Sequence, residues 1–477
     1  MLFNSIEFLI FLPVVFCLYW FVFNKHLKLQ NLLILISSYI FYGWWDWRFL
    51  SLIFLSTVVD YFVGIQIFNN KNTKKKKSFL WLSIVFNLGL LGFFKYFNFF
   101  IESWVDLLSS VGYEYQNVWS LNIILPVGIS FYTFQTMSYS LDIYYNKLKP
   151  TKDFISFASF VSFFPQLVAG PIERASNLLP QILKNRKFNY DDGLKGFSLI
   201  VWGMFKKVAI ADNCAFFVDD IFTNYSSYSG LILLFGAIYF SIQIYCDFSG
   251  YSDIAIGTAR LFGFKLMINF NFPYFSSNIG EFWKRWHISL SSWFRDYLYI
   301  PLGGSRVYFL KKIRNIFVIF IVSGFWHGAN WTFIAWGFIH SIFYLLYLLY
   351  LHFFNYIAIH KNSFIKFLVK FIKITITYFS VLIAWIFFRS SNIESSINYI
   401  VKMVTDLFNI NELIKYRNPF TEGFILEPFI VIVIFIFFEI RLYLDKKLGD
   451  MSLILLIFFT LYFGNFFNPS DFIYFQF

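Results

Sequence analysis

Long apolar segments separated by short polar loops fill most of the sequence. Membrane-spanning helices have this pattern, because about 20 apolar residues are needed to cross the hydrocarbon core of a bilayer. The pattern predicts an all-α polytopic membrane protein with about 11–12 transmembrane helices, organised as a single domain over residues 1–477. The expected spans lie at about residues 7–23, 30–45, 49–68, 79–94, 121–143, 194–218, 229–247, 331–353, 374–388, 428–444 and 451–467, and a further apolar run extends from Ile316 to Gly324.

Three further segments are apolar or amphipathic without having the pattern of a span. Residues 153–170 are interrupted by Phe164-Pro165, so we expect a re-entrant element there. Residues 97–111 and 393–408 carry apolar positions at helical spacing, which predicts helices that lie on the membrane surface.

The positions of the lysines predict the orientation of the chain. Lysines follow the first, third and fifth expected spans, at Lys25, in the run Lys74–Lys77 and at Lys147. These loops are all cytoplasmic only if the N-terminus is extracytoplasmic. We therefore expect a multi-pass protein of the bacterial cytoplasmic membrane, in contact with membrane lipid.

Composition supports a membrane protein and excludes several other classes. The chain has 477 residues, of which 58% are hydrophobic and 14% are charged, which is too apolar for a soluble protein. The net charge of +12 comes from lysines in short loops, so we expect no nucleic-acid partner. The three cysteines are far apart in apolar surroundings, which favours buried thiols over a metal site or disulfides.

Residues 281–331 concentrate the candidate chemistry. Over 281–298 one helical face is rich in tryptophan, and the opposite face carries Lys284, His287, Ser291 and Arg295. This pattern predicts one helix lying in a membrane surface, with His287 on its basic face. A histidine there is more simply a solvated basic residue than a catalytic one.

His327 is expected to lie deep in the membrane. It follows Arg314 by 13 residues, which is roughly 20 Å along a helix, past the middle of a hydrocarbon core about 30 Å thick. An ionisable residue at that depth indicates a functional site, although hydrogen bonds within helix packing would also satisfy it. His340, one segment later, faces the same cavity or is a packing residue, and packing is the simpler interpretation.

Other polar residues lie within apolar segments. Lys206 and Lys207 fall in the middle of a span, which predicts that they snorkel or line a wet interior. The segment Cys246–Asp253 suggests a helix break, where Asp247 and Asp253 would either serve a polar cavity or cap a helix that begins near Ser252.

The sequence lacks the motifs of several enzyme classes and leaves a buried histidine as its main candidate. It has no GxSxG, HExxH, P-loop or paired CxxC motif. A neutral imidazole can act as a general base toward a hydroxyl that attacks an acyl group. Gly324 and Gly328 flank His327, and we expect them to let a substrate approach the backbone closely.

Six segments together carry a specific resemblance to a known family. The chain resembles the membrane-bound O-acyltransferases, in their bacterial polysaccharide-acetylating branch, over nearly its whole length. The segments are LPVGISFYTFQTMSYSLDIY from Leu125, FFPQLVAGPIER from Phe163, GMFKKVAIAD from Gly203, YCDFSGYSDIAIG from Tyr245, EFWKRWHISLSSWFRDYLYIPLGG from Glu281 and FWHGANWTFIAWGFIH from Phe325.

This resemblance implies a site, a donor and partners. It implies a central funnel or tunnel, a catalytic core within residues 121–340, and His327 and His287 as the two family histidines, with His327 catalytic. The acyl donor would be acetyl-CoA or an acyl carrier protein thioester, with no permanently bound cofactor or metal. The acceptor would be a polysaccharide such as an alginate-like exopolysaccharide or peptidoglycan, reached directly or through an extracytoplasmic SGNH-type transferase. The residues expected at the donor site or along the tunnel are Lys284, Arg285, Ser291, Arg295, Trp326, Asp247 and Asp253.

Two alternatives stay open. One is D-alanyl transfer from a carrier protein to teichoic acid, which a related branch of the same family performs. The other is a transporter or flippase, although we detect no internal repeat of the kind many transporters contain.

Overall fold

The structure is a computed structural model that describes residues 1–113, 121, 123–168, 170–354, 363–408, 426–445, 447–466, 470, 472 and 473. All regular structure in these residues is helical, which confirms the all-α fold. The chain divides into two compact units. The first consists of Met1–Ile200 and Ser252–Met267, and the second of Val201–Tyr251 and Ile268–Phe477.

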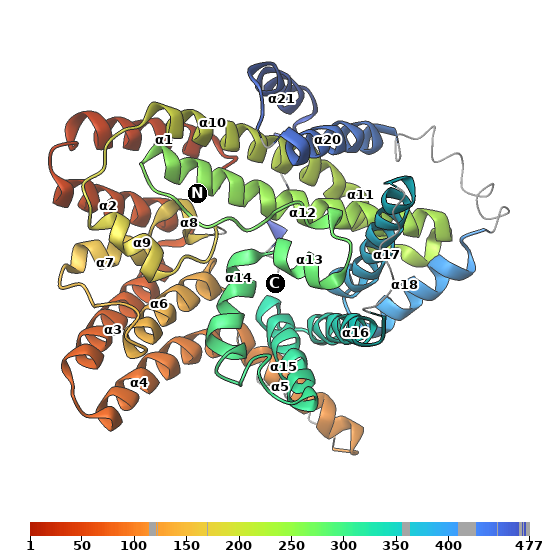
Figure 1. Ribbon diagram of the computed structural model, residues 1–477, viewed down its shortest axis with the longest axis horizontal. Helices are drawn as coiled ribbons and strands as arrows, with labels where there is room; N and C mark the ends of the chain where they lie inside the picture. The colour runs from red at the N-terminus through yellow and green to blue at the C-terminus, as the bar shows by residue number, and fades with distance from the viewer. Residues whose placement is uncertain are drawn as a thin grey trace. The chain divides into compact units, whose positions relative to one another are not determined.

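The first unit is a set of helices held together by polar as well as apolar contacts. Helices α3, α4 and α6 pack against one another, and α2 packs against α7 and α8 (Figure 1). The carboxylate of Asp60 accepts hydrogen bonds from Ser83, Asn87 and Ser140, which ties α3 to α4 and α6. Its helices are α1 Ile6–Cys17, α2 Leu27–Asp46, α3 Leu50–Asn69, α4 Thr73–Leu91, α5 Phe97–Ser110, α6 Ile129–Tyr144, α7 Phe154–Val161, α8 Phe164–Leu167 and α9 Ala175–Ile182.

Two sequence predictions for this unit are confirmed. The expected interruption of residues 153–170 lies between α7 and α8, where the Phe164 amide donates to Ser38 Oγ. The amphipathic segment 97–111 is helical in α5, which buries none of its residues. The position of α5 on the membrane surface and the re-entrant course of residues 153–170 stay predictions.

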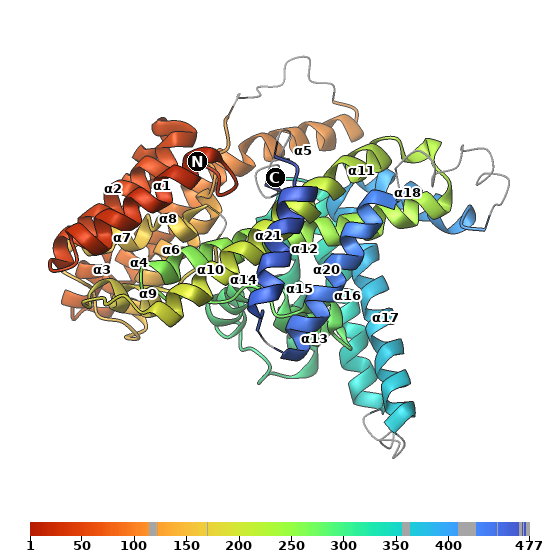
Figure 2. The same cartoon turned by 90° about the horizontal axis from the view of Figure 1, so that it is seen from above.

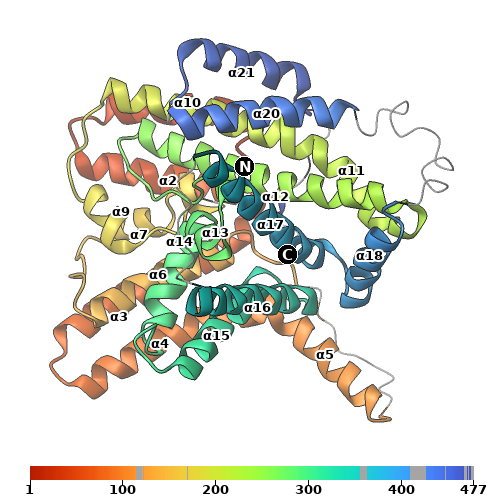
Figure 3. The ribbon, with the colours of Figure 1, turned by 45° about the vertical axis from the view of Figure 1, so that its right-hand side comes forward.

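The second unit contains the longer C-terminal helices, and two helices connect it with the first unit. α10 Tyr190–Met204 and α12 Gly230–Leu261 each have residues in both units. α15 packs along α16, and α16 along α17 (Figure 3). α20 and α21 both pack against the π-helix Phe205–Ala211 (Figure 2). The remaining helices are α11 Asp212–Thr223, α13 Ile279–Arg285, α14 Ile288–Phe294, α15 Phe309–His327, α16 Trp331–Phe354, α17 Ser363–Arg389, α18 Ile393–Thr405, α20 Leu426–Asp445 and α21 Asp450–Phe463.

The expected helix break at residues 246–253 is wrong. α12 continues through this segment, so Ser252 does not begin a helix. The polar side chains do not interrupt the helix, because the segment around Gly203 and Lys206 packs against them. Ser249 accepts a hydrogen bond from Lys206 Nζ, and a Cβ on Gly250 would lie 2.8 Å from the carbonyl oxygen of Gly203.

Five helical stretches among the described residues are long and apolar enough to span a membrane. One of them, Leu27–Asn69, contains both α2 and α3, and three shorter apolar helices accompany the five. The chain is therefore a multi-pass membrane protein. The total of 11–12 spans and the extracytoplasmic N-terminus stay predictions. The other stretches are Thr73–Ser110, Gly230–Leu261, Trp331–Phe353 and Phe364–Arg389.

Candidate active site

His287 and His327 lie side by side in the second unit. Their ring centroids are 6.4 Å apart, and the two residues are 1% and 3% exposed. The expectation that the two histidines are well separated in depth is therefore wrong, and the depth of His327 in the membrane stays a prediction. His327 is the last residue of α15, and His287 lies at the bend between α13 and α14.

The predicted continuous helix over 281–298 is broken at His287. α13 ends at Arg285, and His287 adopts a left-handed conformation with φ of 42° before α14 begins. The segment 269–271 pairs with this break, because Ile288 N–H donates to the Asn269 carbonyl and Ser289 Oγ donates to Asn269 Oδ1. A partner 20 residues away thus stabilises a turn that the helical face pattern does not reveal.

The break also changes what the tryptophan-rich face contacts. Trp286, Leu290 and Trp293 are all buried inside the protein, not in a membrane surface. The two histidines consequently share an aromatic enclosure. The His287 ring lies 4.6 Å from the Phe248 ring, and the His327 ring lies 5.4 Å from that of Phe388.

Burial keeps the imidazole of His287 neutral. Desolvation lowers the pKa of His287 to about 3, because the charged form loses its hydration inside the protein. His287 lies outside the helices long enough to span a membrane. A neutral imidazole presents one donor nitrogen and one acceptor nitrogen, which suits it to orient a polar group beside His327.

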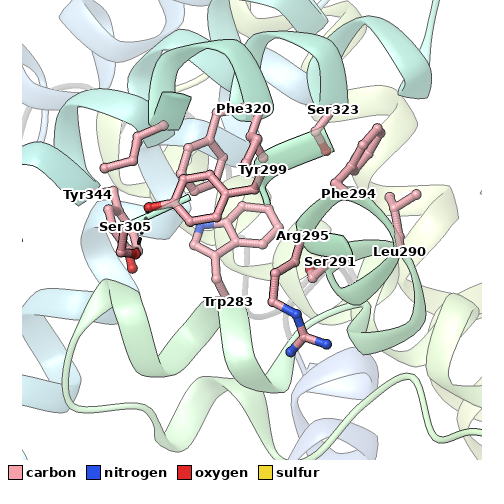
Figure 4. Close-up of a pocket in the computed structure, with 12 residues that line it drawn as sticks. Trp283, Leu290, Ser291, Phe294, Arg295, Tyr299, Ser305, Phe320, Ser323 and Tyr344 are labelled. Carbon is pink, nitrogen blue, oxygen red and sulfur yellow. Dashed lines mark hydrogen bonds between the residues drawn. The ribbon is translucent and has the colours of Figure 1, made fainter. Parts of the chain in front are cut away.

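A cavity of about 230 Å³ is lined by residues that lie close in sequence to both histidines (Figure 4). Ser291, one helical turn after His287, and Ser323, one turn before His327, both line it. Arg295 also lines the cavity, and its guanidinium points away from the aromatic side chains in Figure 4. The remaining lining residues are Trp283, Leu290, Phe294, Tyr299, Ser305, Ile316, Ile319, Phe320 and Tyr344.

The other residues expected at the donor site have separate environments. Lys284 is exposed, and Arg285 forms an ion pair with Glu281 at 2.6 Å. Trp326 is buried, with its ring 5.9 Å from His287 and 5.0 Å from His327. Asp253 is half-buried in the first unit.

Asp247 belongs to an ion cluster that sequence reasoning did not find. Lys207 Nζ lies 2.8 Å from carboxylate oxygens of both Asp212 and Asp247, and all three side chains are at most 3% exposed. The expectation that Lys206 and Lys207 snorkel or face a wet interior is wrong, because both are buried and Lys206 donates to Ser249. The signal in the sequence was the pair of lysines within a span, followed by an aspartate.

This ion cluster holds the C-terminal segment against the aromatic enclosure. Ile473 N–H donates to Asp247, and Ser470 Oγ donates to Asp212. Phe472, between these two anchors, has its ring 6.1 Å from that of Phe248, which contacts His287. The chain end therefore supports the wall of the histidine pair.

The glycines around His327 serve helix packing and leave no room for a substrate. A Cβ on Gly324 would lie 2.2 Å from the Phe333 carbonyl oxygen, and one on Gly328 would lie 2.1 Å from the Phe333 ring. Gly337 approaches the Phe320 carbonyl equally closely. The expectation that Gly324 and Gly328 open the backbone to a substrate is wrong, because α16 fills that space and small residues let the two helices approach.

Comparison with known proteins assigns the family. The sequence model of the MBOAT family, the membrane-bound O-acyltransferases, matches residues 41–388, which is well over half of the chain. This chain belongs to the membrane-bound O-acyltransferase family. The MBOAT match includes both histidines, the cavity and the ion cluster of Lys207.

Two relatives match most of the chain, and a third matches less than half of it. It is 41% identical to the probable alginate O-acetylase AlgI of Pseudomonas aeruginosa over 83% of this chain and 73% of the relative. It is 39% identical to the peptidoglycan O-acetyltransferase of Helicobacter pylori over 85% and 80% of the two chains. The teichoic acid D-alanyltransferase of Bacillus subtilis is 32% identical over only 46% of this chain and 58% of its own. The protein is therefore an acyltransferase enzyme of the membrane.

Proposed function

We propose that this MBOAT enzyme transfers an acetyl group from acetyl-CoA for the O-acetylation of a cell-envelope or secreted polysaccharide. The observation that carries the proposal is the buried His287–His327 pair, whose neighbours Ser291 and Ser323, four residues away in sequence, line a cavity. The identity to alginate and peptidoglycan O-acetylating proteins over more than four fifths of the chain supports the acetyl group and a polysaccharide acceptor.

His327 is the general base in this proposal. Its imidazole takes the proton from an acceptor hydroxyl as the hydroxyl oxygen attacks the thioester carbonyl. The tetrahedral intermediate then collapses, the carbon–sulfur bond breaks, and the proton on His327 passes to the departing thiolate. An ester and free coenzyme A result, and no external oxidant or metal is required. His287 acts beside His327 as a neutral hydrogen-bonding group that orients the reacting atoms.

The donor enters through the cavity from the cytoplasmic side. Arg295 lines the cavity, and the loop and helix that follow it carry Arg306, Lys311, Lys312 and Arg314. Cationic side chains attract the phosphates of coenzyme A, and arginine binds them with a planar fork of donors. The basic residues also agree with a cytoplasmic position under the positive-inside rule.

The acetyl group leaves on the extracytoplasmic side, so that coenzyme A itself does not cross the membrane. The acceptor is the polysaccharide or a serine of an SGNH-type extracytoplasmic transferase that passes the acetyl group on. Either acceptor presents a hydroxyl, from which a histidine base can remove the proton.

The test is acetyl transfer in proteoliposomes supplied with radiolabelled acetyl-CoA and a trapped polysaccharide acceptor, with and without an SGNH-type partner. We expect His327→Ala to lower transfer by roughly 10²–10⁴-fold, the usual contribution of a general base. His352→Ala is the matched control, because His352 is exposed near the end of α16.

Transfer by His327→Ala at the wild-type rate would overturn the general-base role. If the wild type transfers D-alanine from a carrier-protein thioester and no acetyl group from acetyl-CoA, the acetyl proposal is wrong and the D-alanyl alternative replaces it.

A further inference from the structure

Three side chains near the cavity carry buried ring nitrogens that have no hydrogen-bond partner among the described residues. They are Nε1 of Trp283, Nε1 of Trp336 and both nitrogens of His340. Trp336 and His340 are 0% exposed. We call these three residues the donor row, because an indole N–H can only donate and a neutral imidazole has one N–H to donate.

The donor row runs from the cavity to His327 without interruption. Trp283 lines the cavity, and its ring lies 4.9 Å from that of His340. The His340 ring lies 4.8 Å from that of Trp336, which in turn lies 5.1 Å from the His327 ring. Each step is a direct ring contact, so the row connects the donor cavity with the base.

Ordinary aromatic packing does not account for these nitrogens. Buried polar groups in proteins are nearly always hydrogen-bonded to protein, water or a ligand. Some buried aromatic polar atoms of the same unit do have protein partners, since Tyr399 OH donates to the Leu233 carbonyl and Tyr245 OH donates to Glu439. Phenylalanine would fill the three positions with similar rings and no unmet donors.

The position and chemistry of the row identify its ligand. We propose that Trp283, His340 and Trp336 hydrogen-bond the carbonyl oxygens of a thioester donor whose acyl group is carried on a narrow, amide-bearing arm. Such an arm presents amide carbonyls along its length and the thioester carbonyl at its end. Trp336, nearest His327, would donate a hydrogen bond to the thioester carbonyl. Trp283 and His340 would donate to the amide carbonyls of the arm. This inference rests on the proposed function and adds the residues that select the donor.

The experiment measures kcat and KM for acetyl-CoA in Trp283→Phe, His340→Phe, His340→Gln and Trp336→Phe. Each phenylalanine keeps an aromatic ring and removes the N–H. We expect Trp283→Phe and His340→Phe to raise KM roughly tenfold, as for loss of one buried hydrogen bond, and Trp336→Phe to lower kcat by a similar factor. His340→Gln retains a donor and should recover most of the wild-type KM.

Trp202→Phe is the matched control, because Trp202 is buried among Phe205, Phe435 and Phe438 in the hydrophobic core. Folded protein is quantified by size-exclusion chromatography in detergent, and Trp283→Phe at the cavity wall decides the test if His340→Phe does not fold. Wild-type KM and kcat in the donor-row variants, or the same loss in Trp202→Phe, would overturn the inference. Absence of acetyl transfer by the wild type would instead contradict the proposed function.

Discussion

The second unit contains two buried polar groups of opposite character, the ion cluster of Lys207, Asp212 and Asp247 and the donor row of Trp283, His340 and Trp336. In the ion cluster each charge faces a charge of opposite sign at 2.8 Å. In the donor row the nitrogens have no partner among the described residues. An unpaired charge inside a protein is far more costly than an unpaired neutral N–H. A site that is empty before its ligand binds can therefore contain unpaired neutral donors. Buried charges in a structural cluster, in contrast, each need a partner of opposite charge.

The largest effect on stability is expected for Lys207→Met, which tests the structural role of the ion cluster. The variant leaves Asp212 and Asp247 buried together without a cation, and we expect a loss of about 3–5 kcal/mol of folding free energy. Urea or thermal unfolding in detergent, followed by tryptophan fluorescence, measures it. Lys265→Met is the control, because the Lys265 side chain is 71% exposed and lies 3.6 Å from Asp192. Equal stability of both variants would contradict a structural role for the ion cluster.

A smaller effect is expected at the backbone turn that places His287. A left-handed φ of 42° is accessible to asparagine but costs a β-branched residue about 1–2 kcal/mol. His287→Val should therefore unfold at lower denaturant than His287→Asn, while both lose acyl transfer. The same unfolding and transfer assays decide this. If the two variants unfold together, the turn at His287 does not depend on its left-handed conformation.

The smallest effect on stability is expected in the donor row. Trp336→Phe removes an N–H that has no partner in the described part of the chain, so its unfolding free energy should stay within about 1 kcal/mol of the wild type while kcat falls. This variant sharpens the contrast with Lys207→Met, because one change affects activity and the other stability. A large loss of stability in Trp336→Phe would place Trp336 with the structural residues.

Much of the fold could be predicted from apolar runs alone. The apolar run after Arg314 lies within α15, and the interruption near Phe164 separates two short helices. Such features depend on neighbours in sequence, and a helical or broken pattern records them directly. Membership of the MBOAT family followed from motifs that are also local.

The site was less predictable because its geometry depends on distant partners. The turn at His287 requires Asn269, and the continuity of α12 through Asp247 requires Lys207. The local sequence pattern indicates neither Asn269 nor Lys207 as a partner. The polar face of residues 281–298 therefore suggested a surface helix, and the polar segment Cys246–Asp253 suggested a helix break. The proximity of His287 to His327 is likewise a property of tertiary packing.

The anchoring of Ile473 on Asp247 has a consequence for the timing of biosynthesis. The two residues are 226 positions apart, and at 5–20 residues per second their synthesis is separated by roughly 10–45 s. During that interval the ion cluster contains one lysine and two aspartates, and the hydrogen bonds from Ser470 and Ile473 do not yet exist. The wall behind Phe248 is completed only when Ser470, Phe472 and Ile473 have been synthesised and have reached the ion cluster. The enzyme therefore becomes competent only after this late segment has folded back, and a nascent chain stalled before residue 470 would be inserted but inactive.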